Sequence, residues 1–430
     1  MSLIGDLRAM SAGRDFRRLL STRLISQFAD GVFQAALAGY VFFSPERQTV
    51  PAEAAAAFAV LLLPYSVLGP FAGVFIDRWS RRQVLLCSAI AKAVLVAITV
   101  LLVAGGPTWA IYLSALAVLS VNRFLLAALS AALPHVVERD RLVTGNAATT
   151  TAGTILTFLG AGVGAGLRLL VGEGAYGTGA LLLGAGLCWL TAAAVIAGVR
   201  RDRLGPGLDT EPPEVREAMR NVARGLAAGL AHLRARPAAA LALGAITGHR
   251  FLYGIATLMT ALLYRNTFHA DASAGFGGFA IVIAASGAGY FAAAILTPIV
   301  TERISTTSWI TLQLAFAAVV LLGCGLPFRE ALFPGAGFAL GVVSQGVKIC
   351  VDTIVQRNVD DAFRGRVFSV YDMLFNAGFV AAAAVGAAVL PPGGRSVPVL
   401  LGLVLGYALL AVGHAMAADA VRSRGTTGPR

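Results

Sequence analysis

The stretch GVFIDRWSRR occupies residues 73–82 and joins two long apolar runs of the chain. It places one glycine, Gly73, one acid, Asp77, and three arginines, Arg78, Arg81 and Arg82, within a short span. A glycine lets helices pack closely, an acid accepts hydrogen bonds from arginines or a helix end, and arginines bind an anionic membrane surface. A merely basic turn would account for the arginines but not for the spacing of the glycine and the acid. We therefore interpret residues 73–82 as a functional loop between two helices.

Composition places these helices in a membrane. The chain has 430 residues, of which 57% are hydrophobic and only 13% are charged, and its mean hydropathy is +0.77. Soluble domains carry roughly 25% charged residues, so this chain has too few charges for a surface that faces water on all sides. Its apolar runs are about 20 residues long, enough to cross the hydrocarbon core as helices. Because lipid leaves backbone groups no other partner in an open chain, we predict an all-α membrane protein.

The apolar runs predict twelve transmembrane helices in two groups of six. They lie at residues 19–43, 54–76, 83–104, 108–133, 146–171 and 177–199, and at 238–264, 273–300, 307–327, 332–355, 366–390 and 397–419. We therefore divide the chain into an N-terminal six-helix bundle (1–199), a linker (200–236) and a C-terminal six-helix bundle (237–430). From Glu214 onward the linker has apolar residues at helical spacing opposite arginines, which predicts an amphipathic helix, either on the inner membrane surface or simply solvated.

The positive charges indicate the orientation of the chain. Cytoplasmic loops of membrane proteins carry an excess of Lys and Arg. If the N-terminus is cytoplasmic, the outer loops contain only Arg47, Arg265, Arg329 and Arg395. We therefore expect both termini and the linker to face the cytoplasm. This topology accounts for most of the formal net charge of +12, so no nucleic-acid partner is needed to explain it.

With twelve spans and a central linker, residues 73–82 resemble the signature loop of the major facilitator superfamily (MFS), Gly-x-x-x-Asp-Arg-x-Gly-Arg-Arg. Ser80 replaces the second glycine of that pattern. The resemblance implies two pseudo-symmetric six-helix bundles, alternating access and a monomer. It also implies that Gly73, Asp77, Arg78, Arg81 and Arg82 form a loop that controls the conformational change.

Within the superfamily, the chain most resembles bacterial twelve-helix exporters of drugs or siderophores. Drug–proton antiporters of this kind often carry Gly-x-x-x-Gly-Pro in the fifth helix. Here the corresponding run has Gly160 and Gly164, with Ala165 in place of the proline. Close helix packing survives that change, whereas the antiporter assignment is weakened.

Ionisable side chains within the first six predicted spans form a short list of functional candidates. A charge near the bilayer centre costs several kcal/mol, so such residues are expected to face the interior of the bundle. Asp30 is the only acid in these spans, and Arg123, at similar depth, is its expected partner. Lys92 either pairs with Asp30 or contacts an anionic substrate directly. We assign Asp30, Arg123 and Lys92 to proton coupling or charge relay, against the alternative that Asp30 permanently neutralises Arg123 or a helix end.

The second half contains a corresponding group of polar residues. Lys348 and Asp352 stand at positions i and i+4 of one predicted helix, a spacing that favours a local ion pair. His249, Arg250 and Asp372 complete the expected polar cavity of the C-terminal half. Two further residues, Arg168 and His414, lie nearer helix ends, and we interpret them as interfacial.

These features predict a secondary active transporter, with proton-coupled efflux of an amphipathic small molecule (drug, siderophore or lipid-like compound) as the leading function. The alternative is an importer or facilitator of a polar anionic metabolite, because the predicted spans hold more cations than acids. A membrane sensor or assembly subunit is a less favoured third possibility, because no large soluble domain for signalling is predicted from the sequence. An enzyme is not expected, because no phosphate-binding loop, nucleophile motif or metal-ligand cluster is present in the sequence. The expected partners are substrate, protons and the lipid bilayer of the bacterial cytoplasmic membrane, with no cofactor or metal.

Overall fold

The structure, a computed structural model, describes residues 12–43, 79–138, 142–172, 174–200, 203–205 and 215–426. Predicted span 54–76 and the loop residues Gly73, Asp77 and Arg78 lie outside these ranges. Every other predicted span coincides with a helix, and no strand occurs among the described residues. The chain forms two compact units, which divide after Arg220 for the described residues. We call them the N-terminal unit and the C-terminal unit and describe each by itself.

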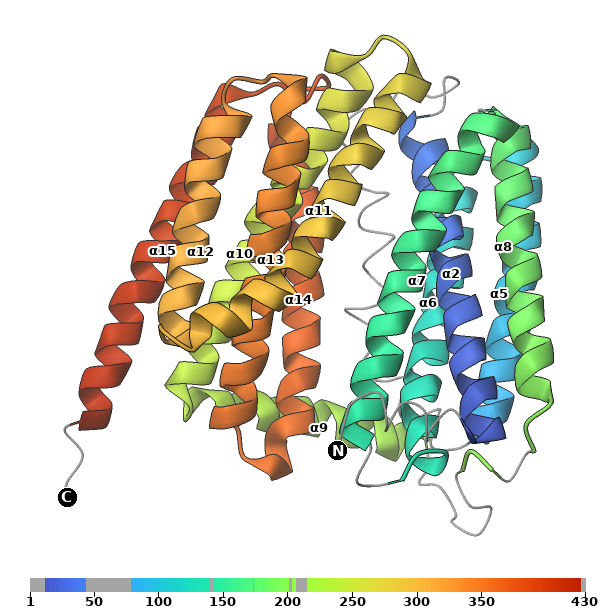
Figure 1. Cartoon of the computed structure of the whole chain (residues 1–430), viewed down its shortest axis with the longest axis horizontal. Helices are drawn as coiled ribbons and strands as arrows, with labels where there is room; N and C mark the ends of the chain where they lie inside the picture. Colours follow the sequence, from blue (N-terminus) through green and yellow to red (C-terminus); the bar gives the residue numbers. More distant parts are fainter. Residues whose placement is uncertain are drawn as a thin grey trace. The chain divides into compact units, whose positions relative to one another are not determined.

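The N-terminal unit is a bundle of long helices (Figure 1). Its described helices are α2 (Arg14–Phe43), α5 (Arg81–Gly105), α6 (Thr108–Ala132), α7 (Leu142–Val171) and α8 (Gly174–Ala197), with a 3₁₀ turn, η2 (Leu133–His135), after α6. The helix α2 packs along both α7 and α8, and α5 packs along α6 and α8. Residues from α2, α5, α6 and α8 therefore meet in the interior of this unit.

The C-terminal unit is a second helical bundle. Its long helices are α10 (Pro237–Leu263), α11 (Ala272–Thr301), α12 (Thr306–Val320), α13 (Phe333–Asn358), α14 (Asp361–Val389) and α15 (Val397–Thr426). Short π-helical segments, η4 (Tyr264–Phe268) and η5 (Leu321–Gly325), extend α10 and α12, and a 3₁₀ turn, η6 (Glu330–Leu332), precedes α13. The helix α10 packs against α13, α14 and α15 and is the central element of the unit.

Length and hydropathy support a membrane location for most of these helices. Among the described residues, nine helices are long and apolar enough to cross a membrane. The helices α2 and α10 are the described predicted spans outside that set, and they carry Asp30 and Arg250. Candidate functional residues also lie on helices of the apolar set, among them Lys92 on α5 and Lys348 on α13.

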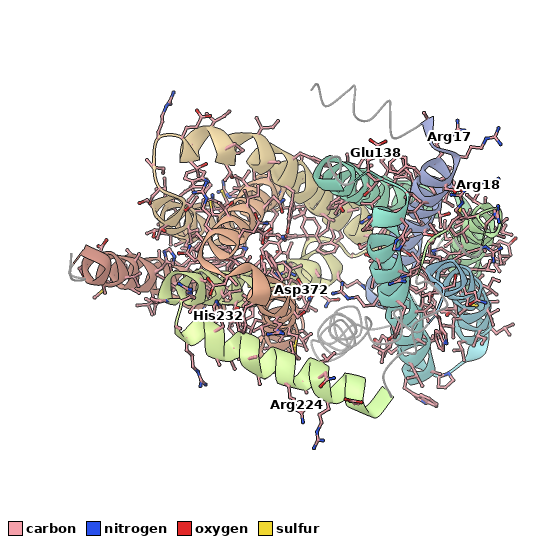
Figure 2. All side chains as sticks on the ribbon, turned by 90° about the horizontal axis from the view of Figure 1, so that it is seen from below. Arg17, Arg18, Glu138, Arg224, His232 and Asp372 are labelled. Atoms are coloured by element: carbon pink, nitrogen blue, oxygen red, sulfur yellow. The ribbon has the colours of Figure 1, made fainter. Side chains whose placement is uncertain are left out.

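The amphipathic helix predicted in the linker is α9 (Val215–Arg234). The junction between α9 and α10 is fastened to the residue before α14: the guanidinium of Arg236, which directly precedes α10, donates to both carboxylate oxygens of Asp360, at 2.8 and 2.9 Å. The ring of His232 stacks on Phe363, with 4.4 Å between ring centroids. Arg224 is exposed and points away from the helices of the C-terminal unit (Figure 2). The end of the linker helix is therefore docked on the C-terminal unit, while its arginine face is exposed.

Glycines set the close approach of α2 and α7. A methyl group added at Gly31 on α2 would overlap the carbonyl oxygen of Thr157, and one added at Gly160 on α7 would overlap the carbonyl oxygen of Phe28. The small residues predicted to pack in the fifth helix therefore do so. Since lipid gives no hydrophobic drive for helix association, such backbone contact is a principal source of packing energy.

We expect Gly160→Ala to destabilise the N-terminal unit by about 1–3 kcal/mol, because the added methyl group forces α7 away from α2. Gly162→Ala is the matched control, since no atom lies within 4 Å of a methyl group added there. That substitution should be neutral or should stabilise the helix by up to about 1 kcal/mol. Denaturant unfolding in mixed micelles measures both effects, and equal effects at the two positions would contradict the packing argument.

Candidate functional site

A buried ion pair lies in the interior of the N-terminal unit. The ammonium of Lys92, on α5, donates a hydrogen bond to Oδ1 of Asp30, on α2. The side chain of Lys92 has no solvent exposure, and Asp30 is 5% exposed. The sequence offers two contacts for Lys92, an acid or a substrate, and the structure forms the first.

Two neutral side chains complete this network. Nζ of Lys92 also donates to Oδ1 of Asn122, on α6, at 2.8 Å. Nε1 of Trp189, on α8, donates to Oδ1 of Asp30 at 3.2 Å and to the backbone oxygen of Ser26 at 3.3 Å. The Trp189 ring also lies under the Lys92 ammonium, 4.2 Å from Nζ to the ring centroid, within the range of a cation–π interaction. We name Asp30, Lys92, Asn122 and Trp189 the buried polar network; it joins α2, α5, α6 and α8.

The chemistry of this network follows from its burial. Removing two charges from water costs several kcal/mol per ion, and the mutual attraction offsets this only when hydrogen bonds satisfy the remaining polar atoms. Asn122 and Trp189 supply those bonds. Of these hydrogen bonds, the one from Lys92 to Asn122 does not involve the Asp30 carboxylate.

The sequence did not single out Asn122 or Trp189 as members of this site. Trp189 is one of four tryptophans in the chain, and an aromatic residue in an apolar helix usually serves packing. Its indole N–H, which needs a partner when buried, was the available signal. Arg123 follows Asn122 on α6 and is half-buried. Its role in charge relay stays a prediction.

The described arginines of the signature loop hold the end of a helix. Arg82, on the first turn of α5, donates to the backbone oxygen of Ala197 at 2.7 Å, and Arg18 of α2 donates to that of Gly198. The backbone N–H of Arg81 donates to the oxygen of Gly205 at 3.0 Å. A cation at the C-terminal end of a helix is favourable, since the last carbonyls lack partners and carry partial negative charge. Arg82 therefore fastens α5 to α8 beyond any role at the lipid surface.

In the C-terminal unit, Lys348 and Asp352 form the ion pair that their spacing predicts. Lys348 Nζ donates to Oδ2 of Asp352 at 2.7 Å, and the two side chains are 39% and 29% exposed. Because both side chains are partly exposed, this pair differs in kind from the buried pair of the N-terminal unit. Exposed ion pairs contribute only about 0–1 kcal/mol to the free energy of unfolding.

His249 and Arg250 are adjacent on α10 but contact different side chains. His249 is fully buried, and its Nδ1 forms a hydrogen bond of 3.2 Å with the hydroxyl of Tyr407 on α15. Arg250 is 8% exposed and lies over the ring of Phe375 on α14, at 4.1 Å from Cζ to the ring centroid. Asp372, also on α14, is exposed. The predicted polar group of this half is therefore divided between a buried His–Tyr bond, an arginine held by aromatic rings and an ion pair on α13.

Two residues interpreted as interfacial are enclosed by neighbouring helices. Arg168 is 2% exposed and donates to the backbone oxygen of Gly39 and to Oγ1 of Thr178, both at 3.1 Å. His414 is 3% exposed and forms a hydrogen bond of 2.9 Å with Thr311. Their depth in the membrane stays a prediction, but within the bundle neighbouring helices enclose both side chains and supply their hydrogen-bond partners.

Comparison with known proteins gives a consistent result. Residues 19–383 match the model of the Major Facilitator Superfamily. An uncharacterised MFS-type transporter of Mycobacterium tuberculosis and one of Mycobacterium bovis are each 38% identical over 413 residues, which cover 94% of this chain and 92% of the relative.

Solved structures of transporters share the fold. A mutant of the nucleoside transporter NupG superposes with a TM-score of 0.71 at 14% identity, covering 93% of this chain and 98% of the other. A bacterial homologue of the human lysosomal transporter Spinster gives a TM-score of 0.66 at 14% identity, covering 95% and 94%. Identities this low show a common fold and carry no information on the transported molecule.

We expect Lys92→Met to destabilise the protein by about 3–5 kcal/mol, because Asp30 is left buried without its counter-ion. Adding Asp30→Asn should recover most of this loss, since the amide is neutral and its oxygen still accepts from Trp189. The free energy of unfolding in mixed micelles measures both variants. A double variant as unstable as the single one would show that Lys92 serves packing rather than charge balance.

Proposed function

The chain belongs to the Major Facilitator Superfamily, and we propose that this membrane transporter is a proton-coupled exporter of an amphipathic small molecule that works by alternating access. The observation that supports coupling is the buried pair of Asp30 and Lys92 within the buried polar network. It is a titratable carboxylate, enclosed by helices, whose charge is balanced by one ammonium. The class of cargo we propose is a drug, siderophore or lipid-like compound.

In this proposal, the charge state of Asp30 selects between conformations. With Asp30 ionised, its attraction to Lys92 favours the arrangement in which α2, α5, α6 and α8 are joined. Protonation removes that attraction while Asn122 still accepts from Lys92, so the energetic preference for this arrangement falls. A proton shifts a conformational equilibrium only by its difference in affinity for the two states. A buried pair provides that difference, because burial makes its electrostatic energy large.

A second candidate is an importer or facilitator of a polar anionic metabolite. It is favoured by Arg250, a nearly buried cation of the C-terminal unit that contacts aromatic rings. An anionic group on the cargo suits either direction of transport. The two candidates therefore differ in direction and in proton coupling, and an experiment has to measure both.

We expect Asp30→Asn to abolish proton-coupled transport, because the amide still accepts a hydrogen bond but does not titrate. The variant also leaves Lys92 without its counter-ion, so only the folded fraction recovered by size-exclusion chromatography is reconstituted. Purified protein in liposomes with an internal pH-sensitive dye and an imposed proton gradient is given lipophilic cations, siderophores and organic anions in turn. Substrate-triggered proton flux should fall to the level of empty liposomes in the variant. Coupled flux that persists in Asp30→Asn would remove this carboxylate from the mechanism.

The control for this experiment is the exchange of Lys348 and Asp352, made as Lys348→Asp with Asp352→Lys. This exchange keeps the net charge and the i, i+4 spacing of a partly exposed pair, so flux should stay within about twofold of wild type. Direction is measured with labelled substrate in oriented vesicles. Export is supported if protons added to the opposite side drive labelled substrate away from the cytoplasmic face against its own concentration gradient. Gradient-independent equilibration of an anion would instead support the facilitator.

A further inference from the structure

The linker helix α9 carries its arginines on the face opposite to its docked side. Gly229 marks the docked side: it is buried, and a methyl group added there would lie 3.1 Å from the backbone oxygen of Arg366. Three arginines of the helix are exposed: Arg220, Arg224 and Arg234. At about 100° per residue, they lie about 140–220° around the helix axis from Gly229. We call these three residues the α9 arginine face.

The charge of this face is not balanced within the described part of the chain. Among the described residues, no acid forms an ion pair with any of the three arginines. Arg224 donates to Oδ1 of Asn221 at 3.5 Å, a long and exposed contact with a neutral group. Glu217 is exposed on the same helix, and even with this acid counted the helix face keeps an excess of positive charge. Its counter-ions therefore come from the surroundings.

The position of α9 determines what those surroundings are. The helix leads directly into α10, and His232 near its end stacks on Phe363 in the first turn of α14. Figure 2 looks along the long helices of the C-terminal unit and shows α9 lengthwise, so α9 runs across their ends. In that view, Arg224 points outward from the unit. Because transmembrane helices end in the headgroup region of the bilayer, a side chain that points sideways at this level meets lipid headgroups.

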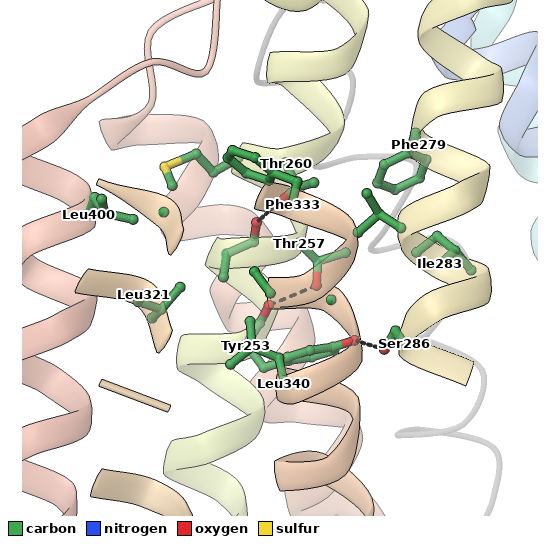
Figure 3. A pocket seen from close by; sticks show the side chains of 16 residues that line it. Tyr253, Thr257, Thr260, Phe279, Ile283, Ser286, Leu321, Phe333, Leu340 and Leu400 are labelled. Atoms are coloured by element: carbon green, nitrogen blue, oxygen red, sulfur yellow. Dashed lines mark hydrogen bonds between the residues drawn. The ribbon is translucent and has the colours of Figure 1, made fainter. Parts of the chain in front are cut away.

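The cavity inside the C-terminal unit is not an alternative site for an anion. It measures about 50 Å³, and none of the described side chains that line it is charged. Figure 3 shows that its hydroxyl groups are already bonded, with that of Tyr253 3.1 Å from that of Ser286. The hydroxyls of Thr257 and Thr260 donate to backbone oxygens of their own helix. Anions are therefore expected at the surface of this unit rather than in its cavity.

We propose that the α9 arginine face binds the phosphate groups of anionic phospholipids in the leaflet beside this helix. Arginine suits this role because its planar donors match phosphate oxygens. Each basic residue near an anionic membrane surface contributes about fivefold in affinity. The alternative that the sequence leaves open, a solvated helix, has no preference between lipids. The proposal does not rest on the export function, because it concerns the lipid around the protein and not the cargo.

Native mass spectrometry of the full-length protein in a neutral detergent tests this proposal, because it resolves each bound lipid. Phosphatidylglycerol and phosphatidylcholine with the same acyl chains are added in turn, and the Kd of the first bound lipid is measured. We expect phosphatidylglycerol to bind at least about tenfold more tightly. Inorganic phosphate at the same concentration should not compete, since it lacks the acyl chains that hold a headgroup beside the helix.

A triple variant locates the binding site on α9. Its substitutions are Arg220→Gln, Arg224→Gln and Arg234→Gln, which remove the charges and keep long polar side chains. The preference for phosphatidylglycerol over phosphatidylcholine should fall by about tenfold or more, because the contributions of three arginines are lost. The replaced side chains are exposed, so the packing of the bundle is unchanged.

The matched control changes the net charge by the same amount at exposed arginines of the C-terminal unit outside α9. Its substitutions are Arg303→Gln, Arg329→Gln and Arg395→Gln. The preference for phosphatidylglycerol should stay within about twofold of wild type, because exposed charges farther away than a Debye length are largely screened.

Three results would overturn the proposal. The first is wild-type protein that binds both lipids with equal affinity, a comparison that needs no variant to fold. The second is a control variant that loses the preference as fully as the α9 variant, since the effect would then follow from net charge. The third is competition by inorganic phosphate, which would assign the face to a soluble anion. None of these measurements applies a proton gradient, so the flux that depends on Asp30 is tested separately.

Discussion

The N-terminal unit depends on one buried electrostatic contact, between the ammonium of Lys92 and the carboxylate of Asp30. An ion pair of this kind is not retained for stability alone, since well-packed apolar residues of similar volume often do as well or better. What it provides is a strict constraint. Neither charge tolerates separation from the other inside a membrane helix bundle, so α2 and α5 are held in register. Asn122 and Trp189 extend that constraint to α6 and α8.

Each unit has a buried hydrogen bond between two of its helices, and the two bonds use different side chains. In the N-terminal unit, the first described helix is joined to the last by the hydrogen bond from Trp189 to Asp30. In the C-terminal unit, α10 is joined to α15 by the bond between His249 and Tyr407. One connection is charged and internally balanced, while the other is made without a carboxylate and stands beside Arg250. In the proposed function, the charged network responds to protons, whereas the bond between His249 and Tyr407 carries no charge to titrate in that step.

Sequence reasoning succeeded where the physics is local. The lengths of apolar runs predicted the described helices because the hydrocarbon core fixes the length of a span, and the spacing of Lys348 and Asp352 predicted their ion pair. It left Lys92 undecided because helical periodicity shows which residues share a face, not which helix lies opposite. Asp30 and Lys92 are separated by 62 positions, and their contact forms only when α2 and α5 come together in the folded bundle. The enclosure of Arg168 escaped the sequence for the same reason, since its partners Gly39 and Thr178 belong to other helices.

The helix α2 is the element on which packing and charge converge. Its adjacent residues Asp30 and Gly31 point about 100° apart around the helix, so the acid reaches α5 and α8 while the glycine presses against α7. The contact at Gly31 is between backbones and does not change with pH, whereas the contact at Asp30 depends on protonation. In the proposed mechanism, a proton therefore loosens α2 on one side only. The seam with α7 remains intact, so α2 and α7 move together relative to α5 and α8.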